Sequence, residues 1–136
     1  MRSVSLMVMT AALAGCSTAP EPERSAKQEA HFQELIAGKV AGAPLSCLPS
    51  YRSRDNMVVV DDNTLVFRDG RRRVYVNHIV GGCNNLSSGF YALVTRQYGG
   101  MGMCRGDIAE VADLTSGSIV GSCSLGDFIP YTSAAR

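Results

Sequence analysis

Apolar residues at helical spacing predict one short amphipathic helix near the start of the folded part of the chain. Phe32, Leu35 and Ile36 fall on one side of a helix that would cover residues 25–38. This apolar side either packs on the rest of the domain or lies on a bilayer surface. We expect it to pack on the domain, because acidic residues offset the nearby lysines and leave no basic face for anionic lipids.

Both ends of this helix carry their own signals. Ser25 followed by Gln28 has the sequence of a capping box, in which each residue's side chain bonds the other's backbone N–H group. Gly38 suits the position just after a helix, where the backbone often turns left-handed. These signals set the predicted bounds.

Beyond Gly42 the pattern changes to that of β-strands separated by turns. Short apolar and β-branched runs are bounded by Asp, Asn and Gly clusters, with no helical pattern between them. The runs cover residues 57–60, 64–68, 71–77, 90–97, 107–112, 118–124 and 128–131. We therefore expect a mainly β domain over residues 40–132, built as a small antiparallel barrel or sandwich.

The Asp69-Gly70 pair predicts a hairpin closed by a two-residue type I′ turn. Such a turn pairs Arg68 with Arg71 and gives the two strands alternating faces. The expected core face carries Leu65, Phe67, Val74 and Val76, and the opposite face carries Arg68, Arg71, Arg73 and Tyr75.

Arg68, Arg71 and Arg73 are accordingly the candidate contacts for an anion. Like charges at cross-strand distance destabilise a hairpin unless something anionic lies beside them. The anion could be an aspartate of this chain, a phosphate-bearing lipid, lipopolysaccharide or an acidic protein. The alternative is a solvated edge whose charges prevent aggregation.

The first residues indicate export. Met1-Arg2 precedes an apolar run from Val4 to Ala12, which is too short to cross a bilayer that needs roughly 20 apolar residues. The run ends in Leu13-Ala14-Gly15-Cys16, which resembles the lipobox of bacterial lipoproteins. This resemblance implies a signal peptide over residues 1–15 and a lipid on Cys16. Residues 16–24 are then the lipidated cysteine and a polar, Pro-bearing tether.

Composition narrows the class of protein. The chain has 136 residues, a formal charge of +1 and 18% charged residues, which indicates one globular domain rather than a nucleic-acid coat or a disordered acidic tail. The core must be built without Trp. A core this small benefits from cross-links.

Four cysteines can supply those cross-links. Cys47, Cys83, Cys104 and Cys123 remain once Cys16 is assigned to lipid, and an even number in an exported chain predicts two disulfides. Their spacing includes no C-x-x-C pair of a structural zinc site, so we expect no metal. Of the three pairings, we favour Cys83 with Cys104 and Cys47 with Cys123, which would tie the first strand to the last.

The sequence offers little support for catalysis. It lacks the glycine-rich phosphate loop, the H-E-x-x-H zinc motif and the G-x-S-x-G nucleophile motif, so we assign no catalytic residue and no cofactor. A thiol at Cys104 or Cys83, helped by His78 and Asp107, is the enzymatic alternative. Their spacing is not diagnostic, and cysteines of an exported domain are usually paired.

The order of short motifs resembles that of a family of small proteobacterial lipoproteins of unknown function. The resemblance spans Ser46 to Tyr131, and its motifs are Cys47, Asp61-Asp62-Asn63-Thr64-Leu65-Val66, Val74-Tyr75-Val76, Cys83-Asn84-Asn85-Leu86, Cys104-Arg105-Gly106-Asp107 and Cys123-Ser124-Leu125-Gly126-Asp127-Phe128. It implies an envelope lipoprotein with a four-cysteine domain, and it supplies no catalytic residue. The arginines at 71–73 depart from the family pattern.

Together these features predict an envelope lipoprotein that acts as a non-enzymatic binding or accessory module. Its expected partners are the membrane, through the lipid on Cys16, and an anionic lipid or envelope protein, but not nucleic acid. Ser17 predicts the outer membrane, facing the periplasm, because lipoproteins kept at the inner membrane commonly have Asp there. The alternatives are an inhibitor or immunity-type partner of another envelope protein and the thiol-dependent enzyme.

Overall fold

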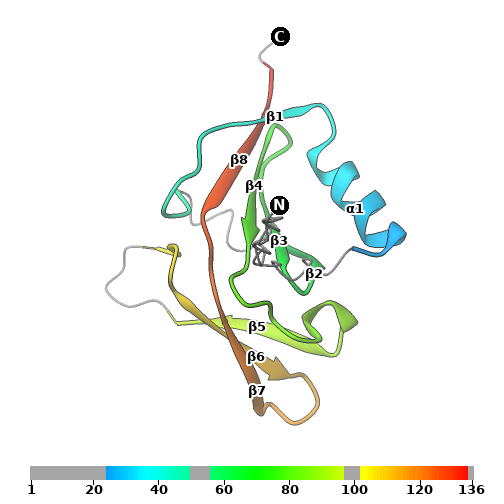
Figure 1. Ribbon diagram of the computed structural model, residues 1–136, viewed down its shortest axis with the longest axis vertical. Coiled ribbons are helices and arrows are strands. Elements are labelled where there is room, and N and C mark those ends of the chain that lie inside the picture. Colours follow the sequence, from blue (N-terminus) through cyan, green and yellow to red (C-terminus); the bar gives the residue numbers. More distant parts are fainter. Residues whose placement is uncertain (1–23, 50–55, 97–101, 135–136) are drawn as a thin grey trace, which may run out of the picture.

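The computed structural model describes residues 24–49, 56–96 and 102–134, which form one helix and two antiparallel sheets (Figure 1). The five-stranded sheet has the order β1-β8-β4-β3-β2, and the three-stranded sheet has the order β5-β6-β7. The mainly β prediction is confirmed. Because the two sheets remain separate over the described residues, the fold is sandwich-like rather than a closed barrel.

The elements follow the predicted runs closely. The helix is α1 (Ala26–Ile36), and a 3-10 turn, η1 (Leu86–Ser88), precedes the small sheet. The strands are β1 (Lys39–Ala41), β2 (Met57–Asp61), β3 (Thr64–Asp69), β4 (Arg73–His78), β5 (Tyr91–Thr95), β6 (Ile108–Asp113), β7 (Ile119–Ser124) and β8 (Phe128–Ser133). The pattern missed only β1, because a three-residue edge strand with mostly exposed side chains leaves no alternation to detect.

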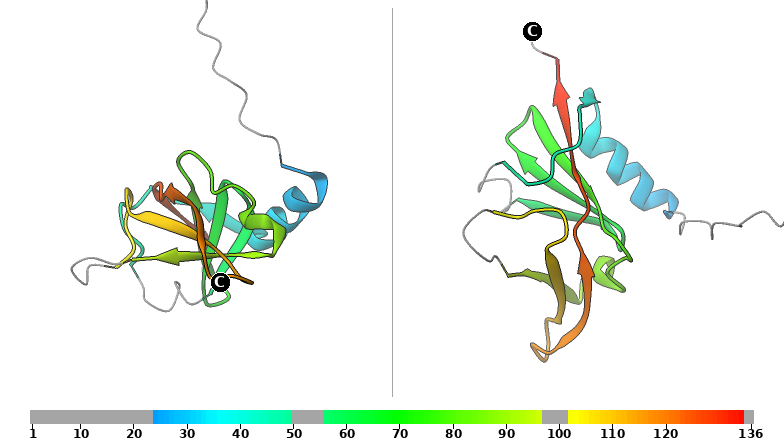
Figure 2. Two further views of the ribbon diagram at one scale, coloured as in Figure 1. Left: turned by 90° about the horizontal axis from the view of Figure 1, so that it is seen from below. Right: turned by 60° about the vertical axis from the view of Figure 1, so that its left-hand side comes forward.

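Helix α1 packs on one face of the five-stranded sheet (Figure 2). The capping box is formed, since the Ser25 hydroxyl accepts from the Gln28 N–H and the Gln28 side chain accepts from the Ser25 N–H. Phe32 and Leu35 are buried against β-branched residues of the sheet. The helix therefore packs on the domain, as predicted, and does not offer its apolar side to a bilayer.

The large sheet is buried on both faces at β3 and β4. Leu65 and Phe67 point into the core between the two sheets, where the rings of Phe67 and Phe128 lie 5.6 Å apart. Val66 and Val76 point the other way, toward α1. Continuous apolar runs are typical of strands buried on both faces, and β3 fits that description.

The predicted register of the β3–β4 hairpin is wrong. Asp69 pairs with Arg73, so the loop contains three residues, Gly70, Arg71 and Arg72. A type I′ turn would need a positive φ at Asp69, whereas in this turn only Gly70 is left-handed.

The new register changes which residues share a face. It turns Tyr75 into the core between the sheets and turns Val74 and Val76 toward α1. Packing on two sides decides the register here, because a shift by an odd number of residues exchanges the faces of the whole strand.

The predicted pairing of the cysteines is also wrong. The disulfides join Cys47 to Cys104 and Cys83 to Cys123. Cys47 and Cys104 face each other in an isolated β-bridge between two loops. The Val80 N–H donates to the Ser124 carbonyl oxygen, which brings the segment leading to Cys83 alongside the end of β7. Contacts between distant segments therefore decide the pairing, and the two disulfides interleave instead of nesting.

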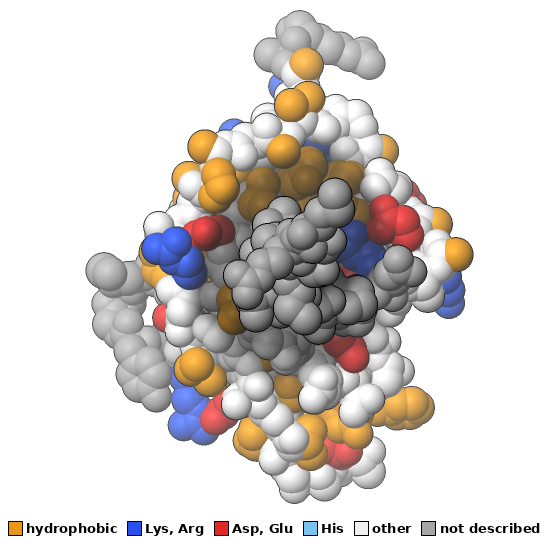
Figure 3. All heavy atoms as spheres, in the orientation of Figure 1, with side chains coloured by type: hydrophobic (Ala, Val, Ile, Leu, Met, Phe, Trp, Pro, Cys, Tyr) orange, Lys and Arg blue, Asp and Glu red, His pale blue; other side chains and the backbone are white. Residues whose placement is uncertain are grey.

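Apolar side chains remain at the surface of the small sheet. Figure 3 shows them over the lower part of the molecule, where β5, β6 and β7 lie. Among the most exposed are Phe90, Leu114, Ile119 and Val120. In the described part of the chain, no helix has the length and apolar character to cross a membrane.

Disulfide mapping tests the observed pairing. A non-reduced digest of the purified protein should yield peptides that join Cys47 to Cys104 and Cys83 to Cys123 in a mass spectrum. Replacing both Cys83 and Cys123 with Ala should lower the free energy of unfolding by about 4 kcal/mol, since that bridge restrains a long segment of the unfolded chain. A digest that joins Cys83 to Cys104 instead would contradict the structure.

Candidate functional site

An open hollow lies where the tip of the β3–β4 hairpin meets the end of β8. Its volume is about 340 Å³, and it is lined by Asp69, Arg72, Arg73, Thr132 and Ser133. Two pairings hold its walls together: Arg73 lies opposite Thr132 in the sheet, and the Ser133 N–H donates to the carbonyl oxygen of Arg72. Backbone hydrogen bonds between the hairpin and β8 therefore hold the walls of the hollow in place.

Arg73 is positioned from two sides. Its Nη1 atom donates to the Tyr75 hydroxyl at 3.4 Å and lies 3.9 Å from an Asp69 carboxylate oxygen. The hydrogen bond with Tyr75, with a smaller contribution from Asp69, raises the pKa of Arg73. About half of this side chain stays exposed, so it can still meet a ligand.

The three predicted arginines do not share a face. Arg68 lies opposite Val74, on the side of the sheet that α1 covers, whereas Arg73 lies opposite Asp69 on the other side. Arg71 is exposed in the hairpin loop. Of the predicted set, only Arg73 lines the hollow.

Arg72 is the residue that sequence reasoning missed. The assumed two-residue turn assigned it to the core face, and the longer loop places it at the hollow instead. The triple arginine at 71–73 was the available signal, since at least one of three consecutive arginines is near the tip in either register.

The hollow has the chemistry of an anion site. Two guanidinium groups against one carboxylate leave it a net positive charge, and Thr132 and Ser133 bring hydroxyl groups. Arginine binds carboxylate and phosphate through two parallel hydrogen bonds. The described lining residues have the groups to bind and orient an anion, and they include no cysteine or histidine that would attack it.

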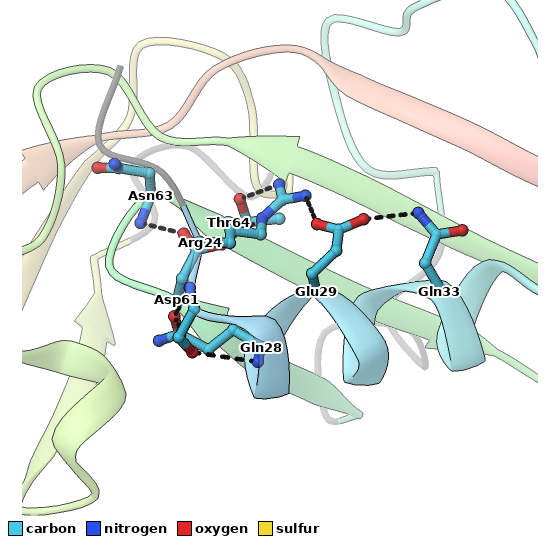
Figure 4. A network of polar contacts seen from close by, with 8 residues as sticks. Arg24, Gln28, Glu29, Gln33, Asp61, Asn63 and Thr64 are labelled. Atoms are coloured by element: carbon cyan, nitrogen blue, oxygen red, sulfur yellow. Dashed lines mark hydrogen bonds and ion pairs between the residues drawn. The ribbon is translucent and has the colours of Figure 1, made fainter. Parts of the chain in front are cut away.

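A second cluster fixes the start of the domain (Figure 4). The Arg24 guanidinium donates to Asp61 at 2.6 Å, to Thr64 at 2.8 Å and to Glu29 at 3.1 Å. Its centre lies 4.2 Å from the Phe32 ring centroid, within cation–π distance. Arg24 therefore belongs to the folded domain and not to the predicted tether over residues 16–24. We call this cluster the Arg24 clamp.

The pKa shifts of Arg24 and Glu29 are those expected for an ion pair. Burial alone would lower the pKa of Arg24, but its bonds to Asp61 and Glu29 outweigh burial and raise it. Hydrogen bonds from Gln33 and Arg24 lower the pKa of Glu29. Both shifts favour the charged forms that hold the helix to the sheet.

The hollow and the Arg24 clamp lie at opposite ends of β3. The clamp holds Thr64, at the start of that strand, and the hollow includes Asp69 at its end. The rise of a strand separates these residues by ~17 Å, and the eleven residues of α1 span about the same length. The hairpin tip is thus one helix length away from the point where the tether joins the domain.

Both cysteines of the thiol alternative are in disulfides. Cys104 is bonded to Cys47 and Cys83 to Cys123, so neither has a free thiol in this state. The Asp107 carboxylate accepts from the backbone N–H of Cys104 and closes a turn. His78 is exposed at the end of β4.

Asp62-Asn63 is the turn between β2, which ends at Asp61, and β3. Asp61 accepts from the Asn63 N–H, and Asp62 accepts from backbone N–H groups of the η1 segment. No group of three or more His, Cys, Asp or Glu side chains gathers to hold a metal within residues 24–49, 56–96 and 102–134. Cys16 and the predicted signal peptide lie outside these residues.

Comparison with known proteins gives a family match. Residues 1–118 match the model of DUF6491, described as a family of unknown function. No curated protein and no solved structure matches the chain.

Phosphate titration tests the hollow. Adding inorganic phosphate to the purified protein should shift the backbone NMR signals of Arg72, Arg73, Thr132 and Ser133. Replacing Arg72 and Arg73 with Ala should weaken this binding about tenfold or more, because each charge-assisted hydrogen bond contributes about 1.5–3 kcal/mol. Arg68→Ala is the matched control, since Arg68 lies on the other face of the sheet. An equal loss in the control would argue against the hollow.

Denaturation with urea tests the Arg24 clamp. Arg24→Met keeps much of the side-chain length but leaves the largely buried Asp61 without its cation, and should lower the free energy of unfolding by about 1.5–3 kcal/mol. Arg105→Met is the control, because its ion pair with Asp127 is exposed on both sides and should contribute about 0–1 kcal/mol. Equal losses in the two variants would show that the clamp is an ordinary surface pair.

Proposed function

Because the chain belongs to the DUF6491 family, whose function is unknown, we propose a function from its own residues: it is a lipid-anchored, non-enzymatic binding protein of the bacterial cell envelope. The observation that carries this proposal is the distance between the predicted lipid site and the Arg24 clamp. Cys16 ends a lipobox-like sequence, and only eight residues later the Arg24 clamp begins the folded domain.

The short link keeps the domain at the membrane. Eight extended residues reach at most ~26 Å, which clears lipid headgroups but does not let the domain act far from its bilayer. The two disulfides support the export part of the proposal, because disulfides persist in oxidising compartments such as the periplasm. Ser17 in place of Asp favours the outer membrane, with the domain facing the periplasm.

The hollow supports the binding part of the proposal. Its guanidinium and hydroxyl groups suit a ligand that carries a phosphate or a carboxylate. Its place one helix length from the Arg24 clamp lets such a ligand approach away from the point where the chain joins the membrane. The disulfides of Cys104 and Cys83 favour this binding role over thiol chemistry.

Lipid labelling tests the anchor. The full chain, expressed in a Gram-negative host with an alkyne-labelled palmitate, should carry the label and fractionate with the outer membrane. Cys16→Ser should carry no label and should not be processed to the mature length.

Ser17→Asp is the matched control for location. It should keep the label, since Cys16 is unchanged, and should move the protein toward the inner-membrane fraction. A labelled Cys16→Ser variant, or an unlabelled native chain of full length, would contradict the proposed anchor.

A further inference from the structure

The outer face of the small sheet carries the ion pair of Glu110 with Arg96 in its middle and exposed apolar side chains at one end. Phe90 is 70% exposed, Leu114 62%, Val120 56% and Ile119 50%. These four residues, which we call the apolar patch, lie at the end of the sheet where β5 begins and β6 ends. Figure 3 shows apolar side chains at the surface in this region. Exposed apolar side chains that gather in one patch mark binding surfaces more often than singly scattered ones do.

The register of the sheet places the apolar patch on one face. Ala92 pairs with Ala112, and Ala112 pairs with Ile119, so these side chains lie together. Two positions further along, on the same face, the Leu114 N–H donates to the Phe90 carbonyl oxygen and continues the same ladder. The inward face, with Leu93 and Val111, belongs to the core. The apolar patch therefore lies on the face of the small sheet that points away from the core.

A short series of contacts connects the apolar patch to the Arg24 clamp. Arg24 holds Asp61, and the next residue, Asp62, accepts from the backbone N–H of Ser87 at 2.8 Å. Phe90 follows Ser87 by three residues, which span at most ~10 Å. The segment that leaves the domain at Arg24 thus starts on the side where the patch begins.

We propose that the apolar patch contacts the lipid surface of the membrane in which Cys16 is anchored, and so orients the domain. This inference rests on the proposed function, because it needs the lipid on Cys16. The residues between Cys16 and Arg24 span at most ~26 Å, which lets the patch reach the bilayer interface. Aromatic and aliphatic side chains bind there by burying apolar area at the headgroup boundary.

This contact places the apolar patch at the bilayer and the hairpin tip in the aqueous phase. With Phe90 and Leu114 at the bilayer, the hairpin tip lies beyond the Arg24 clamp by the length of β3 and points toward the periplasm. The hollow then meets anions of the periplasm and not the headgroups of its own membrane. An orienting contact of this kind does not need to be strong, since the lipid already supplies the attachment.

Tryptophan fluorescence tests the proposal directly, because the chain contains no Trp. Phe90→Trp places a single reporter in the apolar patch. Val40→Trp is the matched control: Val40 is 73% exposed and lies opposite Thr132, at the hollow. Each lipidated mature protein is reconstituted into vesicles of phosphatidylethanolamine and phosphatidylglycerol, with and without brominated acyl chains, and vesicle flotation measures anchoring.

Four results decide the outcome. In floating vesicles, brominated lipid should quench Phe90→Trp and shift its emission to shorter wavelength, and should leave Val40→Trp unchanged. Equal or absent quenching of both reporters in protein that floats overturns the proposal and leaves the anchor intact. Failure of the native protein to float overturns both the anchor and the proposal. A short-wavelength emission of Phe90→Trp already in detergent-free solution would assign the patch to a second copy of the chain instead.

Discussion

The contacts of Arg24 determine how the leading segment of the chain is attached to the folded domain. One guanidinium group binds the sheet through Asp61 and Thr64 and the helix through Glu29, and it lies over the Phe32 ring. A single residue therefore fixes the start of the described chain to both the helix and the sheet. The reach from the predicted lipid site to each surface of the domain is therefore counted from Arg24.

Burial on both faces of β3 and β4 is the second constraint, and it places the arginines. Val74 and Val76 must lie under α1 while Tyr75 fills the core between the sheets. This burial requires a three-residue loop between β3 and β4. The resulting register places Arg68 and Arg73 on opposite faces of the sheet and brings Arg72 to the hollow. The local preference of Asp-Gly for a two-residue turn is worth little against a full strand of side chains that would otherwise face the wrong layer.

Local signals in the sequence predicted the elements well, and long-range packing decided what they could not. The capping box at Ser25 and the apolar runs gave the helix and all strands but β1, because spacing and caps are properties of neighbouring residues. The disulfide pairing and the hairpin register depend on which distant segments meet. Of the predicted anion site only Arg73 lines the hollow, since a shift in register moved its neighbours. The role of Arg24 left no local signal, because its partner Asp61 lies 37 residues away.

The domain has two chemically different ends, and the Arg24 clamp lies between them. The hairpin tip carries exposed guanidinium groups and hydroxyls, whereas the far side of the small sheet carries Phe90 and Leu114. A tether with a reach of ~26 Å alone would let either end approach a bilayer. The two ends differ in what they gain there: apolar side chains gain by leaving water, while exposed arginines gain only a screened attraction to anionic headgroups. For a chain anchored as proposed, that difference favours an orientation in which the small sheet lies at the membrane and the basic hollow faces away from it.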